Sequence, residues 1–248
     1  MVQMRAHSEV ELPVLVIIPA RGGSKRIPKK NIRPFFGIPI LTRVIDEIGK
    51  CSFAKTITVS TDSEEIAHVA QISGVNVQNR PAALADDDAG LLEVMRHEIT
   101  EFSKVDNNFR YVCCVLPTAV LMDASDLSQA VEQIKTASDN FLISIGKYSS
   151  PIWRGLQVDP NGQMSMIFPE NVGSRTQDLP NAYHDAGQFY VAHRETWLTA
   201  SSILNHDFRG VEVSALRVQD IDDEADWIQA EQAFQLLNRV TPWEDHHG

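Results

Sequence analysis

Short apolar runs rich in β-branched residues alternate with amphipathic segments through the first two-thirds of the chain. Runs of this length between turn-forming residues are typical of buried strands, whereas apolar residues spaced three or four apart mark one face of a helix. Strands are predicted at residues 12–18, 56–60, 75–78, 111–116 and 141–145. This alternation predicts an α/β fold, a mostly parallel sheet with helices on both faces.

Helices are predicted between these strands from their start signals and apolar faces. The first begins near Pro39, a favourable first-turn residue, and the second follows cap signals at 61–63. The third is expected to be capped by 86–88, and the fourth covers 126–135. Toward the C-terminus the predicted elements are strands at 187–192 and 210–216, a short helix after Arg194 and a final helix at 223–238.

The stretch from about 150 to 181 interrupts this alternation. It is rich in turn formers, and Asp159-Pro160-Asn161-Gly162 predicts a hairpin. We expect a single domain over 1–248, into which this stretch is inserted as an arm that leaves the sheet.

The composition is that of an ordinary globular protein, with 43% hydrophobic and 22% charged residues. A net charge of -11 argues against non-specific nucleic-acid binding, which needs a broad basic surface. No apolar run approaches the roughly 20 residues of a membrane-spanning helix, and none near the N-terminus has the length of an export signal. We therefore expect a cytoplasmic protein without a nucleic-acid or membrane partner, with Cys51, Cys113 and Cys114 as buried free thiols.

Cations are concentrated in one loop of this acidic chain. Between residues 21 and 33 lie six of the 22 basic residues, Arg21, Lys25, Arg26, Lys29, Lys30 and Arg33. A charge run alone is most often a solvated loop, but this one follows the first predicted strand at a Gly22-Gly23 turn, where α/β sheets bind ligands. Backbone amides with Lys and Arg suit a triphosphate. The segment matches neither G-x-G-x-x-G nor the P-loop pattern.

The segment IPARGGSKRIPKKNI, residues 18–32, resembles the nucleotide-binding motif of the sialic-acid type cytidylyltransferases, the CMP-nonulosonate synthetases. Within that family, AYHDAGQFY at 182–190 and QDIDDEADW at 219–227 are most similar to the members that act on pseudaminic acid. The resemblance runs over nearly the whole chain. It implies a Rossmann-like nucleotidyltransferase fold, CMP transfer from CTP to a nine-carbon sugar acid, and a homodimer in which the arm at 150–181 helps to close the partner's active site.

The same resemblance assigns the nucleotide contacts residue by residue. They are Ala20, Arg21, Gly22, Gly23, Ser24, Lys25, Lys30, Asn31 and Arg80. Arg21 and Lys30 would be catalytic, because preorganised cations stabilise charge that grows on the α-phosphate and the departing pyrophosphate. The expected reaction is attack of the sugar's anomeric hydroxyl on the α-phosphorus of CTP, and no residue is identified as its general base.

Asp220-Ile221-Asp222 is the candidate metal site. In an extended segment residues i and i+2 point to the same side, so both carboxylates can face one hard cation while Ile221 packs inward. The resemblance places a catalytic Mg²⁺ there. A lone D-x-D is more often a pair of helix-capping acids, but Asp223 or Glu224 can serve the final helix instead.

Six residues are candidates for the sugar site, namely Leu116, Arg175, Tyr183, His184, Gln188 and Tyr190. The alternatives are a surface position for Arg175 and half-buried packing roles for the residues of 183–190. Leu116 stands where sialic-acid enzymes carry a glutamine, and Met122 where they carry an arginine. Loss of these polar contacts favours a more deoxygenated sugar such as pseudaminic acid.

Three other functions compete with this interpretation. The nearest is a cytidylyltransferase for sialic, legionaminic or ketodeoxyoctonic acid. A regulatory protein that binds CTP without turnover belongs to a different class. A P-loop ATPase is disfavoured, because no lysine-serine or lysine-threonine step follows the glycines.

Overall fold

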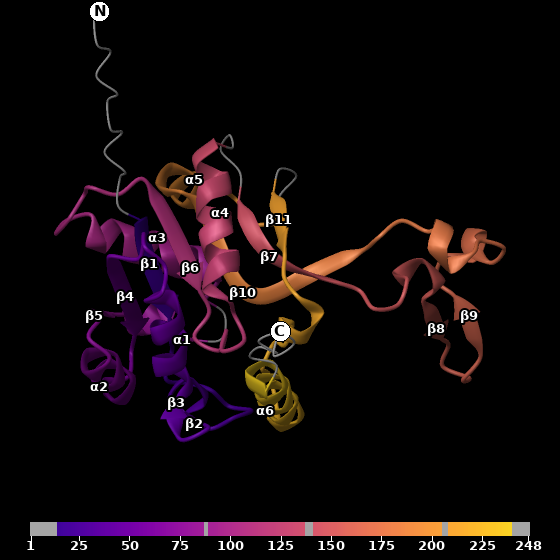
Figure 1. Ribbon diagram of the computed structural model, residues 1–248, viewed down its shortest axis with the longest axis horizontal. Helices are drawn as coiled ribbons and strands as arrows, with labels where there is room; N and C mark the ends of the chain where they lie inside the picture. The colour runs from indigo at the N-terminus through magenta and orange to yellow at the C-terminus, as the bar shows by residue number, and fades with distance from the viewer. Residues whose placement is uncertain (1–13, 87–88, 137–140, 205–207, 240–248) are drawn as a thin grey trace, which may run out of the picture.

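The computed structural model describes residues 14–86, 89–136, 141–204 and 208–239. Its centre is a seven-stranded sheet with the order β11-β7-β10-β6-β1-β4-β5 (Figure 1). The strands are β1 Val14–Pro19, β4 Thr56–Thr61, β5 Asn76–Asn79, β6 Tyr111–Val115, β7 Leu142–Lys147, β10 Tyr183–His193 and β11 Arg209–Glu212. Only β10 runs antiparallel to its neighbours β6 and β7. The predicted α/β fold with a mostly parallel sheet is therefore confirmed.

Helices cover both faces of this sheet. They are α1 Ile40–Ile48, α2 Glu64–Ile72, α3 Leu91–Phe102, α4 Ala124–Thr136, α5 Arg194–Thr199 and α6 Glu224–Arg239. Because side chains alternate along a strand, Val16 of β1 packs in the cluster formed with α1, α2 and α4, whereas Ile17 packs in the cluster of α3 and α5. The burial of both faces explains the continuous apolar runs of the central strands.

A third cluster fixes the long connection between β1 and α1. This connection contains a 3₁₀ turn at Lys30–Ile32 and the small hairpin of β2 Pro34–Phe35 and β3 Ile38–Pro39. Ile27 and Phe35 are fully buried in it, against Trp227 and Ala230 of α6. The rings of Phe35 and Trp227 meet edge to face at 5.4 Å. The N-terminal basic loop therefore lies beside the C-terminal helix, about 190 residues further along the chain.

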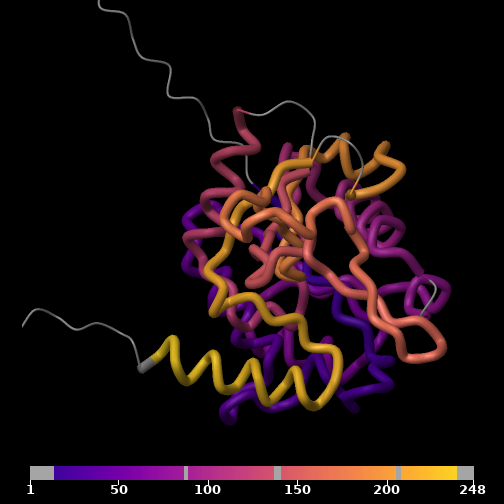
Figure 2. The backbone as a smooth tube through the Cα atoms, turned by 90° about the vertical axis from the view of Figure 1, so that its right-hand side faces the viewer, coloured from indigo at the N-terminus to yellow at the C-terminus, as the bar shows by residue number. Residues whose placement is uncertain are grey.

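The predicted arm is a second antiparallel hairpin, β8 Leu156–Val158 with β9 Met164–Met166. Its turn follows the predicted motif, since the Asp159 carboxylate accepts from Asn161 N and Gly162 has a φ of 84°. Figure 1 shows the hairpin projecting away from the sheet, and Figure 2 looks from the arm's side onto the body. The hairpin predicted at 159–162 is confirmed.

Two boundaries differ from the predictions by four residues, and one predicted helix cap differs as well. β10 begins at Tyr183 rather than 187, because a bulge at Gly187, φ 65°, lets the strand continue through a register shift. β11 ends at Glu212 rather than 216, and Leu216 is exposed, so the apolar pattern there did not reflect burial. α3 follows Gly90 without a side-chain cap, and Asp86 does not cap it because its carboxylate accepts a hydrogen bond from Ala89 N instead. Residues 12–13 and 87–88 of the predicted elements lie outside the described residues.

The cysteines match the prediction, since Cys51, Cys113 and Cys114 are buried free thiols. In the described part of the chain, no helix combines the length and apolar character that crossing a bilayer requires.

Candidate active site

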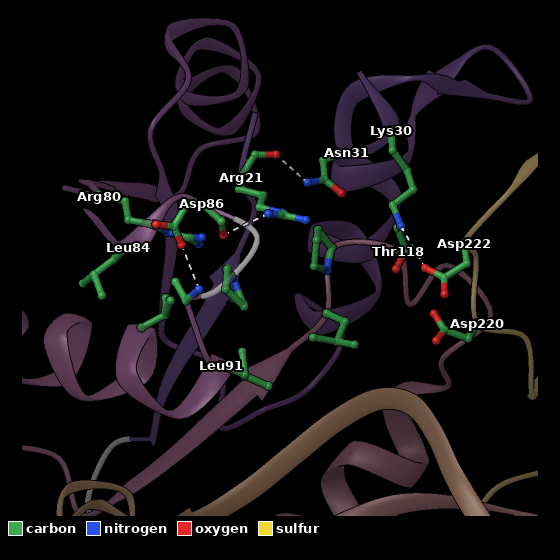
Figure 3. A pocket seen from close by; sticks show the side chains of 15 residues that line it. Arg21, Lys30, Asn31, Arg80, Leu84, Asp86, Leu91, Thr118, Asp220 and Asp222 are labelled. Carbon is green, nitrogen blue, oxygen red and sulfur yellow. Dashed lines mark hydrogen bonds and ion pairs between the residues drawn. The ribbon is translucent and has the colours of Figure 1, made fainter. Parts of the chain in front are cut away.

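Two adjoining cavities open at the carboxyl ends of β1, β5 and β6. Their volumes are about 360 Å³ and 300 Å³. Four residues line both of them, Arg21, Lys30, Asn31 and Asp222. Figure 3 shows the larger cavity, with Arg80 and Leu84 on one side and Asp220 and Asp222 on the other. This edge of an α/β sheet is where ligands bind.

The two cavities differ in chemical character. Apolar side chains contribute to the larger one, including Leu84, Leu91, Val94 and Leu116, together with the guanidinium of Arg80. The smaller one is lined by Ser24, Lys25 and Arg26 besides the shared residues. A ligand with a ring system and an anionic tail would match this division, because rings pack on apolar walls and cations bind anions.

The acidic segment Asp220-Ile221-Asp222 closes one side of the site. Ile221 is fully buried in the α6 cluster, and both carboxylates line the larger cavity. Burial, and next the negative charge of Asp222, raise the pKa of Asp220. Two carboxylates held this close repel each other, so a cation between them would be stabilised.

Neither carboxylate of this pair caps α6. The Asp223 carboxylate accepts hydrogen bonds from the backbone N–H groups of Ala225 and Asp226. The Asp226 carboxylate accepts from the N–H groups of Asp222 and Asp223 in return. Because other acids satisfy the helix start, the side chains of Asp220 and Asp222 remain directed at the cavity.

Lys30 and Arg26 connect the basic loop to this acidic segment. Lys30 Nζ donates to Ile221 O at 2.6 Å and lies 3.7 Å from Asp222 Oδ1. Arg26 Nη2 donates to the same Asp222 oxygen at 2.7 Å. The prediction did not select Arg26 from its cluster, since nothing local distinguishes it from Lys25 or Lys29.

Among the predicted nucleotide contacts, six line the cavities and three do not. Arg21, Ser24, Lys25, Lys30, Asn31 and Arg80 line one or both cavities. Ala20, Gly22 and Gly23 are absent from the linings. Gly22 N donates to Asp62 Oδ1 at 2.8 Å, and a Cβ on Gly22 would lie 3.0 Å from Ser63 Cβ. Gly22 therefore allows the loop to approach the start of α2, and its amide is not directed at a ligand.

Arg21 and Asn31 hold each other in place. Asn31 Nδ2 donates to Arg21 O at 2.9 Å, and Arg21 Nη1 donates to Asp86 O at 2.9 Å across the larger cavity (Figure 3). Asn31 Oδ1 is buried and has no partner among the described residues. A buried acceptor without a hydrogen-bond donor costs free energy, so a ligand that donates a hydrogen bond to this oxygen would be stabilised.

Arg80 is buried and held by β4. Its Nε donates to Ser60 Oγ and its Nη2 to Ser60 O, both at 2.9 Å. Ser60 Oγ in turn donates to Glu98 Oε1 at 2.7 Å. Burial raises the pKa of Glu98 to about 7, against the lowering effects of the Ser60 hydrogen bond and the Arg80 charge. Nothing local in the sequence distinguishes Ser60 or Glu98, because they belong to segments with ordinary strand and helix patterns.

The predicted sugar residues are divided among three places. Leu116 lines the larger cavity. Gln188 and Tyr190 of β10 are buried, where Gln188 Nε2 donates to Arg217 O at 2.6 Å and Tyr190 Oη donates to Asp185 Oδ2 at 2.7 Å. Neither of these two residues lines a cavity.

The remaining sugar candidates lie at the start of β10 and on the arm. Tyr183 is exposed, and the ring of His184 packs at a tilt against the ring of Tyr148, with centroids 4.8 Å apart. Arg175 lies on the arm, where its Nε forms an ion pair with Asp178 at 2.8 Å and its side chain is 74% exposed. None of these residues lines either cavity of its own chain. Met122 is 2% exposed and packs in the core below α4, so it does not face the cavity.

Arg217 is a further residue that the sequence did not reveal. Its guanidinium binds Leu121 O at 3.0 Å and Asp123 Oδ2 at 2.7 Å. It therefore ties the loop after β6, which carries Leu116, to the segment that leads into Asp220. A single arginine in an irregular stretch gives no periodic or motif signal.

The chain is similar to known proteins over most of its length. A family model described as cytidylyltransferase matches residues 15–193. The pseudaminic acid cytidylyltransferase of Campylobacter jejuni subsp. jejuni serotype O:2 is 37% identical over 185 residues, 74% of this chain and 80% of that protein. The CMP-N,N'-diacetyllegionaminic acid synthase of Legionella pneumophila is 28% identical over 232 residues, 90% of this chain and 97% of that protein.

Solved structures show the same fold. A CMP:2-keto-3-deoxy-manno-octonic acid synthetase complexed with CTP aligns with a TM-score of 0.67 at 15% identity. The alignment covers 91% of this chain and 99% of that one. Its agreement supports the predicted Rossmann-like nucleotidyltransferase architecture.

Proposed function

Because the chain belongs to the cytidylyltransferase family, we propose that it transfers CMP from CTP to the anomeric hydroxyl of a nonulosonic acid, with release of pyrophosphate. The chain is a nucleotidyltransferase, and the proposal concerns its substrates and the residues that act on them. One observation carries it: the cationic loop and the Asp220–Asp222 pair meet at two adjoining cavities, one partly apolar and one basic. These features match a nucleoside triphosphate and a metal.

Pseudaminic acid is the proposed sugar. The chain is 37% identical to the pseudaminic acid cytidylyltransferase of Campylobacter jejuni. Its identity is 28% to the legionaminic acid synthase and 29% to N-acylneuraminate cytidylyltransferase B of Danio rerio. The apolar Leu116 at the cavity wall supports a sugar with fewer hydroxyl groups. N-acetylneuraminic or legionaminic acid is the alternative.

The cavities suggest how CTP is oriented. We place the cytidine in the larger cavity beside Arg80 and the triphosphate along the basic loop. Lys30 already donates one hydrogen bond to Ile221 O, which fixes its ammonium group and leaves two N–H donors for phosphate oxygens. Arg21 has a planar guanidinium, which binds two oxygens at once. Both charges stabilise the negative charge that develops as pyrophosphate departs from the α-phosphorus.

The two carboxylates fit a magnesium ion. Hard oxygen ligands are what Mg²⁺ binds. Burial, and after it the negative charge of Asp222, raise the pKa of Asp220, and a divalent cation beside the two carboxylates would offset both effects. When bound, Mg²⁺ would neutralise phosphate charge. Asp220 and Asp222 would hold it, while Lys30 and Arg26 keep Asp222 oriented.

A homodimer is part of the proposal. The arm exposes apolar residues, including Leu156, Val158 and Val172, and holds Arg175 away from the cavities of its own chain. A second copy would cover these side chains and receive Arg175 at its sugar site, where a guanidinium can bind the sugar's carboxylate. We expect this dimer in the cytoplasm, where its nucleotide substrate is made, and without a nucleic-acid partner because the chain is acidic.

Incubation with a sugar panel tests the proposal. The protein is mixed with CTP, Mg²⁺ and pseudaminic, legionaminic, N-acetylneuraminic or ketodeoxyoctonic acid, and the CMP-sugar is detected by mass. Pseudaminic acid is expected to give the highest kcat/KM. A higher value for another sugar would establish the alternative substrate. CTP binding with no product from any sugar would favour a regulatory protein.

A further inference from the structure

We propose that Glu98 is a positioning residue for nucleotide binding, which acts through the Ser60 hydroxyl to fix the guanidinium of Arg80 at the cavity wall. The inference rests on the proposed function in one respect, that the larger cavity binds CTP. It concerns a residue of α3 that does not line the cavity.

The three side chains form one buried line from α3 to the cavity. Glu98 and Ser60 are 0% exposed and Arg80 is 5% exposed. The Ser60 hydroxyl carries a single hydrogen, which it donates to Glu98 Oε1 at 2.7 Å. Its oxygen can then accept from Arg80 Nε at 2.9 Å. The direction of the Ser60 hydroxyl, and with it the anchor of Arg80, depends on an acceptor at Glu98.

The setting of Glu98 argues against a role in packing alone. Its neighbours on the same face of α3, Met95 and Ile99, are apolar and fully buried. A carboxylate among them is costly unless an opposite charge compensates it, and an apolar side chain would fill the space more stably. Arg80 supplies that opposite charge. The pair is less stable than an apolar core would be, but it holds the guanidinium in one position.

Few other charged groups of the described residues act on the pair. They are Glu101, also on α3, for Glu98, and Asp62 and Arg21 for Arg80, while burial keeps the nearby Cys114 thiol neutral by raising its pKa. Among the nearby carboxylates, Glu98 therefore stabilises the charged form of Arg80 most strongly. A neutral Glu98 accepts a weaker hydrogen bond and no longer balances the buried guanidinium. Because the pKa of Glu98 is about 7, nucleotide affinity is expected to fall as pH decreases through neutrality.

The test begins with Glu98→Gln, which keeps the shape and an acceptor but removes the charge. At pH 8 its KM for CTP is expected to rise about fivefold, with kcat within about twofold of wild type. Glu101→Gln is the matched control, since Glu101 lies one turn further along α3 and pairs with Lys104 at the surface. Its KM should equal that of wild type.

Double variants distinguish a positioning role of Glu98 from general damage to the protein. In an Arg80→Lys background, Glu98→Gln should change KM little further, because the group that it positions is already altered. Ser60→Ala should raise KM in the same way and remove most of the effect of Glu98→Gln. If Glu98→Gln does not fold, Ser60→Ala still tests whether the line from Glu98 to Arg80 fixes the guanidinium.

The pH profile gives an independent readout. The ratio of the two KM values, Glu98→Gln over wild type, should approach one below pH 6, where the wild-type residue is also neutral. Taking the ratio cancels the titration of CTP itself. An unchanged or lower KM at pH 8, or an equal effect in the Arg80→Lys background, would overturn the proposal.

Calorimetric titration with CTP keeps the two proposals distinguishable. If the wild type binds CTP but turns over no sugar, the proposed function fails. The same comparison of variants then proceeds on Kd, where a value for Glu98→Gln equal to wild type would refute the role of Glu98 separately.

Discussion

The basic loop and the arm are both long insertions between regular elements, but they are stabilised in opposite ways. The loop is anchored by Ile27 and Phe35, which are fully buried against α6. The arm instead presents Leu156 and Val158 with more than half of their surface exposed. The loop is thus completed by its own chain, whereas the arm has apolar surface that a partner would cover. Under the proposed function, nucleotide binding would be built within one chain and sugar binding would be shared between two.

The largest expected effect comes from the loop. Lys30→Met removes the ammonium group that the Asp220–Asp222 segment holds, and kcat/KM is expected to fall about 10³-fold, as for loss of other preorganised charge stabilisers. The melting temperature should change little. Lys29→Met is the matched control, because Lys29 is adjacent but its side chain is 67% exposed and pairs with Glu65. Equal losses in both variants would show that the loop acts only by its overall charge.

The next effect concerns how the loop is anchored. Phe35→Ala leaves a cavity against Trp227 and is expected to lower the free energy of unfolding by about 3 kcal/mol, measured by urea denaturation. Phe36→Ala is the control, since Phe36 is 41% exposed and should cost much less. If the two variants were equally stable, α6 would not be what orders the loop.

Much of this architecture follows from local sequence. The strands and helices were predictable because burial on two faces imposes runs and periods that a short window contains, as in Val14–Pro19. The loop was also predictable, since six cations lie within 13 residues. Its approach to Asp220 and Asp222 required the family resemblance, because no local pattern reports contacts across 190 residues.

What could not be predicted depends on how separate elements meet. The amide of Gly22 was expected to face a ligand, but it donates to Asp62 of another segment. The line from Glu98 through Ser60 to Arg80 joins α3, β4 and the end of β5, and each residue is unremarkable in its own element. Met122 is a further case, since the family resemblance matches this position to an arginine, but the side chain lies in the core. Tertiary packing decided these outcomes rather than propensity.

The shared sugar site can be tested with mixed dimers. Arg175→Ala is expected to raise the KM for the sugar about tenfold with little change in the KM for CTP, because a charged hydrogen bond to the sugar is lost. In a hybrid with Lys30→Met, one site combines an intact loop with an intact arm from the other chain. Equal mixing and exchange should therefore restore about a quarter of wild-type activity at limiting sugar.

Each variant mixed only with itself is the control for this experiment. Rescue above both controls places Arg175 in the partner's site. If mixing restores no activity although subunit exchange is verified by mass, Arg175 acts in its own chain or has no role at the sugar site. The arm would then not contribute to the partner's site, and the proposed difference between loop and arm would be wrong.

The smallest effect on folding is expected from the arm itself. Leu156 and Val158 share one exposed face of β8, so replacing both by Asp should change the free energy of unfolding by less than about 0.5 kcal/mol in the isolated chain. For the proposed homodimer, sedimentation should nevertheless shift from dimer to monomer, because the variant would bury two charges at the interface. Gln157→Asp, on the opposite face of the same strand, should leave the dimer intact. A double variant that stays dimeric would mean that another surface joins the two copies, and the arm would then be free to act within its own chain.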